Sequence, residues 1–225
     1  MMKYYPVNLD LKSRRCLVVG GGSVGTRKVM TLLKCGAMLT VVSPVVSQQI
    51  GELANSKSLT LKKRHYQTSD MNGMFLVIGA TNDENLNWRV HTDAEHIGKL
   101  CNIADRPEIC NFILPSIVNR GDMIITVSTS GKSPAFAKKL RQDIEKQFGE
   151  EYGIFLQLMG AIRKKLLLRS HAPEAHKSTF EKLISKGLLE MIRDDRKDKA
   201  NQLLADVLGR EYEFDSLMGK GHTKD

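Results

Sequence analysis

The sequence predicts an α/β protein that opens with a doubly wound parallel sheet and ends in an all-helical region. Through the first 113 residues, short apolar runs alternate with segments whose apolar residues recur at helical spacing, as in parallel strands joined by helices. The first run passes directly into a glycine-rich turn. We therefore expect three parts: a sheet domain over residues 1–113, an α+β segment over 114–150 and an all-α region over 151–225.

Five apolar runs are the expected strands, because parallel strands are usually buried on both faces. They cover residues 16–19, 39–42, 59–61, 75–78 and 100–104. Helices are expected between them over residues 24–35, 47–54 and 83–97, the last with Asp83 as candidate N-cap.

The pattern changes after the fifth run. Apolar residues at 112–118 and 123–127 flank a polar turn and predict a β-hairpin. Pro134 is well placed in the first turn of a helix that runs to about residue 148. From residue 152 the pattern is helical, with breaks near Pro173 and Gly187, and we expect the tail beyond Gly209 to be frayed.

The four cysteines stand singly, without the spacing of zinc ligands or of a disulfide framework. Cys16 and Cys101 lie in apolar runs and are expected to be buried thiols. The six histidines form no metal-binding pair at the usual spacing, so we assign no metal site. Apolar stretches are too short for a membrane span or a signal peptide. These features predict a cytoplasmic protein without a membrane partner.

The formal charge of +9 is distributed along the chain, with +5 in residues 1–113 and +2 in each later part. No dense basic arm or interleaved aromatic residues accompany it, as they would in many proteins that bind nucleic acid. The charge suits a small polyanionic ligand at least as well as DNA. A nucleic-acid-binding protein is the weakest alternative, and we expect no nucleic-acid partner.

The glycine-rich turn matches G-x-G-x-x-G through Gly20, Gly22 and Gly25. A strand precedes it and a helix follows, which is the context of a Rossmann dinucleotide site. The first glycine makes the tight turn, the second admits the pyrophosphate, and the third allows the helix to pack closely. Ser23 and Val24 open the helix, whose N-terminal N–H groups can bind the anion. The alternative is a glycine-rich turn without a ligand.

The end of the second strand departs from the usual NAD fingerprint, in which an acidic residue binds the ribose. No acidic residue occurs from Leu11 to Gly51, and no arginine follows the strand to bind a 2′-phosphate. Ser43, with Pro44 and Val45 beside it, is the candidate contact to the ribose. These residues leave the choice between NAD and NADP open.

Five sequence elements stand in order within residues 6–140, preceded by Pro6 and Leu9. They are residues 16–28 (CLVVGGGSVGTRK), 79–83 (GATND), 101–105 (CNIAD), 112–116 (FILPS) and 128–134 (STSGKSP). Together they resemble the precorrin-2 dehydrogenases of siroheme synthesis, including the N-terminal part of bacterial siroheme synthase. One difference is Gly25, where many members have alanine. The helical end from about residue 150 adds little to the resemblance.

The resemblance implies NAD as cofactor and the dehydrogenation of precorrin-2 to sirohydrochlorin. Some members also insert ferrous iron, so iron is a candidate second substrate. Members are homodimers, which implies that residues 114–150 form a dimer interface. Their C-terminal helices help to cover the tetrapyrrole cleft.

Asp105 is the candidate catalytic residue. It follows a parallel strand at its carboxyl end, where open α/β sheets place ligands, and a carboxylate there could accept the proton released during dehydrogenation. The key aspartate of the family aligns with it. The alternative is a structural cap before Arg106 and Pro107.

Other polar residues follow strands in the same way. Thr81 is a candidate cofactor contact, and Asn102 a candidate substrate contact or a partner for a backbone group. The turn before Pro134 could bind substrate carboxylates or could be a solvated turn. Its candidate residues are Ser128, Thr129, Ser130, Lys132 and Ser133.

A regulatory module that senses dinucleotides without turnover is the main alternative function. It would explain the glycine turn and a dimer. It would not explain the elements at 102–105 and 128–134.

Overall fold

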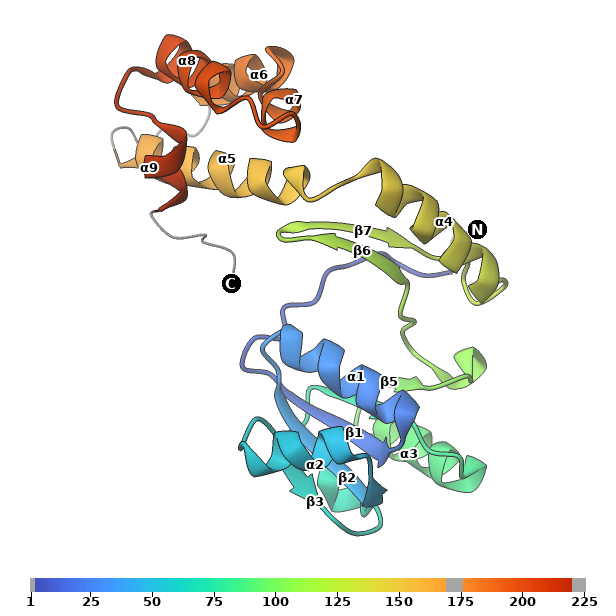
Figure 1. Ribbon diagram of the computed structural model, residues 1–225. Helices are drawn as coiled ribbons and strands as arrows, with labels where there is room; N and C mark the ends of the chain where they lie inside the picture. Colours follow the sequence, from blue (N-terminus) through green and yellow to red (C-terminus); the bar gives the residue numbers. More distant parts are fainter. Residues whose placement is uncertain (1–2, 169–175, 220–225) are drawn as a thin grey trace. The chain divides into compact units, whose positions relative to one another are not determined.

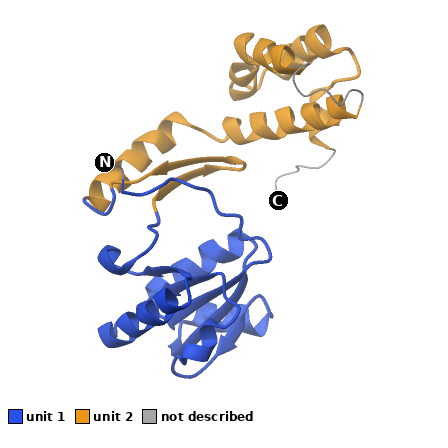
Figure 2. Ribbon diagram, turned by 180° about the vertical axis from the view of Figure 1, so that it is seen from behind, with its two compact units in different colours: residues 1–114, 130–132 blue, residues 115–129, 133–225 orange. Residues whose placement is uncertain are grey.

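A computed structural model describes residues 3–168 and 176–219. The chain forms two compact units, one of residues 1–114 with 130–132 and one of residues 115–129 with 133–225 (Figure 2). The division into three parts at residues 113 and 150 stays a prediction.

The first unit contains a five-stranded sheet in the order β3-β2-β1-β4-β5 (Figure 1). Every neighbouring pair is parallel. The strands are β1 (Arg15–Gly21), β2 (Met38–Val46), β3 (Thr60–Lys62), β4 (Leu76–Gly79) and β5 (Leu100–Ile103). This order confirms the Rossmann-like doubly wound sheet. From β1 the chain adds β2 and β3 on one side and then β4 and β5 on the other, and such sheets bind ligands at the switch point between β1 and β4.

Helices cover both faces of this sheet. They are α1 (Ser23–Lys34), α2 (Gln48–Asn55) and α3 (Glu84–His96), with short 3-10 turns η1 (Thr68–Met71) and η2 (Pro107–Ile109). Cys16 and Val18 of β1 pack with α1 and α2, whereas Leu17 and Val19 pack with α3. This alternation follows from the two-residue period of a strand. Cys16 and Cys101 are fully buried, as predicted.

Two predicted strand ends were wrong. β2 continues to Val46, past Pro44, because Val46 pairs with Gly21 after an irregularity in β1. The strand expected from residue 112 begins instead at Ser116. Phe112 is held elsewhere, since its carbonyl accepts a hydrogen bond from Asn102 Nδ2 (3.1 Å).

The second unit begins with the predicted hairpin, β6 (Ser116–Arg120) and β7 (Met123–Val127), paired antiparallel. Helix α4 (Pro134–Gln147) packs on both strands. The Arg120 guanidinium joins β6 to the end of α4, donating to the carbonyls of Glu145 (3.1 Å) and Phe148 (2.8 Å).

The rest of the second unit is helical. The helices are α5 (Glu151–Leu167), α6 (Lys177–Ser185), α7 (Leu188–Arg193), α8 (Lys197–Leu208) and α9 (Phe214–Met218). The break predicted near Gly187 is confirmed, because this glycine precedes α7 with φ +80°. None of the helices in the described ranges combines the length and apolar character that a membrane crossing requires.

The prediction of a frayed tail beyond Gly209 was wrong for the residues up to Gly219. Tyr212 and Phe214 are buried in the helical core, and α9 contacts α5 and α8. The Phe214 N–H also donates to Asn201 Oδ1 (2.8 Å). The break expected near Pro173 and the last six residues, 220–225, lie outside the described residues.

Candidate functional site

The glycine turn lies where β1 and β4 end side by side. Gly20 has φ +112°, and a Cβ on this residue would lie 2.2 Å from the carbonyl oxygen of Ala80. A Cβ on Gly25 would lie equally close to the carbonyl oxygen of Gly20. Both positions therefore require glycine in this backbone, one for the turn and one for the close approach of α1.

Gly22 differs from its two neighbours in the motif. It occupies the N-cap position of α1, has no side chain to cap the helix, and a Cβ there would have no atom within 4 Å beyond those of its chain neighbours. The first bond within the helix runs from the Thr26 N–H to the Gly22 carbonyl (2.9 Å), so the N–H groups of Ser23 and Val24 have no helical acceptor. This open space above donor groups fits the pyrophosphate of a dinucleotide.

The end of β2 lies beside the turn. The Ser47 N–H donates to the Gly21 carbonyl (2.9 Å), and the Ser47 and Thr26 hydroxyls are 2.8 Å apart. The Ser43 hydroxyl donates to the Val45 carbonyl (2.6 Å), which leaves its oxygen able to accept from a ribose hydroxyl. Ser43, Pro44 and Val45 are thus near the turn, and their cofactor role stays a prediction.

Thr81 also lies beside Gly20, but its side chain serves the loop after β4. Its hydroxyl is 2.9 Å from Asn87 Oδ1 and 3.0 Å from the Asp83 carbonyl, and Asn87 Nδ2 donates to the Thr81 carbonyl (2.9 Å). Asp83 accepts from the Leu86 N–H (3.1 Å) and caps α3, as expected. A cofactor contact by Thr81 stays a prediction.

Asp105 stands exposed just beyond β5, with φ +61°. It is the third residue of a turn from Ile103 to Arg106, closed by a bond from the Arg106 N–H to the Ile103 carbonyl (3.3 Å). The N-cap position of the following η2 is Arg106 and not Asp105, which argues against the capping alternative. Arg106 pairs with Glu84 at the start of α3 and so holds the turn from outside.

Lys28 is a residue of this region that the sequence analysis gave no role. It lies half-buried on α1. Burial lowers the pKa of the Lys28 amine, helped by Arg27, while the Asp105 carboxylate and Cys110 oppose the shift. Lys28 is therefore close enough to Asp105 for their charges to interact. Its only sequence signal is its place in the element at 16–28.

Asn102 is nearly buried at the end of β5. Its amide Nδ2 donates to the Phe112 carbonyl (3.1 Å) and approaches Cys110 Sγ (3.5 Å). This geometry matches the alternative in which the side chain satisfies a backbone group. A substrate contact by Asn102 stays a prediction.

The turn at 128–133 is divided between the units. Thr129 and Ser133 belong to the second unit, where Thr129 Oγ1 binds the backbone of Ser133 and Ser133 Oγ accepts from the Phe136 N–H (3.3 Å) to cap α4. Ser130 and the exposed Lys132 belong to the first unit, where a Cβ on Gly131 would lie 3.5 Å from Pro107. That contact brings residues 130–132 next to η2, which begins two residues after Asp105. The predicted substrate contacts of this turn, including Ser128, stay predictions.

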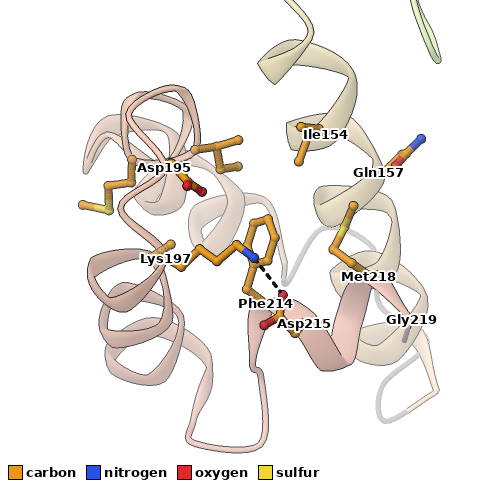
Figure 3. A pocket seen from close by; sticks show the side chains of 11 residues that line it. Ile154, Gln157, Asp195, Lys197, Phe214, Asp215, Met218 and Gly219 are labelled. Carbon is orange, nitrogen blue, oxygen red and sulfur yellow. Dashed lines mark hydrogen bonds and ion pairs between the residues drawn. The ribbon is translucent and has the colours of Figure 1, made fainter. Parts of the chain in front are cut away.

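A cavity of about 470 Å³ lies among the helices of the second unit (Figure 3). Its lining is mostly apolar, from Ile154, Met191, Phe214 and Met218 among others, with the carboxyl groups of Asp195 and Asp215. Lys197 pairs with Asp215 (3.5 Å). Two carboxylates with one cation suit a polyanion poorly, so we place no part of the candidate site here.

Within the described part of the chain, no three His, Cys, Asp or Glu side chains gather where they could hold a metal ion. The candidate site consists instead of the glycine turn, the end of β2 and the Asp105 turn, all in the first unit.

Comparisons with known proteins indicate the family to which the chain belongs. Residues 7–116 match a family model described as "Putative NAD(P)-binding", and residues 120–147 match "Sirohaem biosynthesis protein central". A solved structure of SirC, precorrin-2 dehydrogenase, is 30% identical with a TM-score of 0.71, over 91% of this chain and 98% of that one. The chain belongs to the precorrin-2 dehydrogenase family. This confirms the resemblance and the prediction of a nicotinamide dinucleotide as cofactor.

Longer relatives of the family contain the same region. Siroheme synthase of Nitrosococcus oceani is 35% identical over 92% of this chain and 44% of its own length. Siroheme synthase of Pseudoalteromonas atlantica is 34% identical over 99% of this chain and 47% of its own length. This chain thus spans somewhat less than half the length of these two relatives.

Proposed function

We propose that this protein catalyses the NAD-dependent dehydrogenation of precorrin-2 to sirohydrochlorin. The observation that carries the proposal is the pairing of two features in one unit. An anion cradle opens at Gly22, and an exposed carboxylate, Asp105, follows β5 at the same carboxyl ends of the sheet. Membership of the precorrin-2 dehydrogenase family supports the choice of substrate.

In this reaction, separate residues of the chain bind the cofactor and accept the substrate proton. The N-terminus of α1 binds the pyrophosphate, and Ser43 accepts from a ribose hydroxyl. NAD, when bound, supplies the acceptor for a hydride. Asp105 accepts the proton that leaves the substrate carbon or pyrrole nitrogen as the hydride departs, so that two electrons and two hydrogens are removed.

Positive groups around Asp105 suit the carboxylates of the tetrapyrrole. Lys28 interacts with Asp105, and Lys132 lies in the turn that approaches η2. Both can form charge-assisted hydrogen bonds to acetate or propionate side chains. We include the hydroxyl groups of Ser128, Ser130 and their neighbours in the turn as further hydrogen-bond donors to these carboxylates.

Four more detailed parts of the expected function also belong to this proposal. They are a homodimer formed through residues 114–150, a cytoplasmic location, the use of NAD in preference to NADP, and ferrous iron as a second substrate. Relatives named siroheme synthase support a place in siroheme formation.

The decisive experiment is anaerobic incubation of the protein with precorrin-2 and either NAD or NADP, without iron. Growth of the absorbance of reduced cofactor together with that of sirohydrochlorin supports the proposal and identifies the cofactor. Nucleotide binding without either absorbance change would favour the dinucleotide sensor. A parallel run with ferrous iron tests chelation.

A matched pair of variants tests the role of Asp105. Asp195 is also an exposed aspartate with positive φ (+52°), but it lies in the second unit. We expect Asp105→Asn to lower kcat by about 100-fold or more and to leave NAD affinity unchanged. Asp195→Asn should keep full turnover. Near-normal turnover by Asp105→Asn would remove its catalytic role.

A further inference from the structure

The Cys110 thiol lies inside the turn that carries Asp105. Its sulfur accepts from the Ile103 N–H (3.1 Å) at the start of the turn. At the other end of the turn, the thiol donates toward the Arg106 carbonyl (3.1 Å), with the Ile103 carbonyl slightly farther away (3.4 Å). One side chain thus bridges both ends of the turn that has Asp105 as its third residue.

The turn needs such support, because Asp105 has a positive φ that costs an L-residue of order 1–2 kcal/mol. The bond from the Arg106 N–H to the Ile103 carbonyl, at 3.3 Å, is long for the main closure of a turn. Burial raises the pKa of the Cys110 thiol, so the thiol keeps its proton and can donate at neutral pH.

The sulfur is itself fixed by the neighbouring chain. Asn102 Nδ2 approaches Cys110 Sγ and donates to the Phe112 carbonyl. Between these residues, Asn111 pairs with Cys101 in both directions: its N–H donates to the Cys101 carbonyl (3.2 Å) and its Oδ1 accepts from the Cys101 N–H (2.8 Å). The segment at 110–112 therefore lies firmly along β5, which sets the position of the thiol.

We propose that Cys110 is a positioning residue for Asp105, holding the Ile103–Arg106 turn in the conformation that presents the carboxylate. The proposal rests on the proposed function, in which Asp105 accepts the substrate proton. Cys110 contacts neither substrate nor cofactor in this role. A change at Cys110 should therefore act on the chemical step and leave binding intact.

The test compares three variants of the whole chain by kcat and KM. We expect Cys110→Ala to lower kcat by about 10- to 100-fold, the effect of a small misplacement of a reacting group, with KM for NAD and precorrin-2 within about twofold. Cys110→Ser keeps a donor and an acceptor and should recover kcat to within about threefold of the unmodified protein.

Cys101→Ala is the matched control. It removes the same atom from a fully buried position on β5, and no bond from the Cys101 thiol to the turn is found among the described residues. It should lower thermal stability and keep kcat. If Cys110→Ala keeps kcat, if Cys101→Ala lowers kcat as strongly, or if Cys110→Ser fails as badly as alanine while folded, the proposal is overturned.

A second measurement separates this inference from the proposed function. Hydrogen exchange of the Ile103 amide should be fast in Cys110→Ala and slow in Cys110→Ser, because the sulfur or oxygen protects that N–H. Absent turnover by the unmodified protein would defeat the proposed function and, with it, the positioning role. Turnover with unchanged Ile103 exchange in Cys110→Ala would defeat the positioning role alone.

Discussion

The two turns of the candidate site are built in opposite ways. The glycine turn depends on the backbone alone: Gly20 and Gly25 leave no room for a Cβ, and the absence of a side chain at Gly22 leaves the N–H donors of α1 accessible to a ligand. At the Asp105 turn the candidate catalytic side chain stands on a strained backbone, and other side chains hold that turn. The first turn depends on atoms that must be missing, and the second on atoms that must be present.

This difference decides how each turn responds to substitution. Adding atoms harms the glycine turn, since a methyl group meets backbone that cannot move aside cheaply. Removing atoms harms the Asp105 turn, since a buried donor or acceptor loses its partner. Substitutions that respect or violate these rules can test the comparison.

Gly20→Ala should have the largest effect. Its Cβ would lie 2.2 Å from the Ala80 carbonyl oxygen in a backbone with φ +112°. We expect the free energy of unfolding to fall by about 3–5 kcal/mol, combining backbone strain with overpacking. Urea unfolding followed by circular dichroism measures this loss. A loss below about 1 kcal/mol would show that the turn adapts easily.

Asp70→Asn extends the comparison to a third turn, also built from side chains. The Asp70 carboxylate is buried in η1, where it binds Arg64 (2.6 Å), Lys62 (2.8 Å) and the Gln67 N–H (3.0 Å). Because both cations are about one-third exposed, we expect a loss of about 2 kcal/mol, less than for a fully buried pair.

The same carboxylate predicts a pH dependence. Hydrogen bonds from Arg64, and then those from Lys62 and Gln67, hold the pKa of Asp70 well below its usual range. Its contribution to stability is therefore complete above the ordinary aspartate pKa of about 4 and is lost as the pH falls further. Unfolding curves between pH 7 and pH 2 should show a smaller acid loss for Asp70→Asn than for the unmodified protein. Equal acid losses would contradict this assignment.

Gly22→Val should separate binding from stability. Since no atom lies within 4 Å of a Cβ at this position, we expect a change in stability below about 1 kcal/mol. The valine would fill the space above the α1 N-terminus and weaken NAD binding by about tenfold or more, equivalent to about 1.4 kcal/mol. Calorimetric titration with NAD measures the affinity. Unchanged affinity would mean that the pyrophosphate binds elsewhere.

Arg106→Ala should have the smallest effect. Its pairing with Glu84 holds the Asp105 turn from the solvent side, and both side chains are more than one-third exposed. Exposed ion pairs contribute little, so we expect a stability loss below about 1 kcal/mol and a change in kcat smaller than that of Cys110→Ala. A larger kcat effect for Arg106→Ala would mean that the turn is held chiefly from outside.

The two turns also differ in how far the sequence predicted them. Gly20, Gly22 and Gly25 act through a property of one residue type at a fixed local spacing, so a motif predicts them. Cys110 and Asn111 act on β5 through contacts between segments about ten residues apart, and no local pattern announces such contacts. Asp105 was found by its place after a strand, but the side chains that hold it were not.

The same reason explains the errors in the fold. The alternating apolar runs predicted all five strands, because each strand carries its own pattern. The tail beyond Gly209 was expected to fray because it is a terminal segment. Tyr212 and Phe214 are ordered there by contacts with α5 and α8, which precede them in the chain and leave no sign in the tail itself.

The segment at 110–112 has one more consequence. β5 is the last strand of its sheet, so the N–H groups on its outer side would otherwise face solvent. Instead, Asn111 Oδ1 accepts a hydrogen bond from the Cys101 N–H, and Cys110 Sγ accepts one from the Ile103 N–H. An unpaired outer strand is a template on which a foreign extended chain can add, the usual start of aggregation between sheets. The residues that hold the Asp105 turn therefore also protect this edge strand from the addition of a further strand.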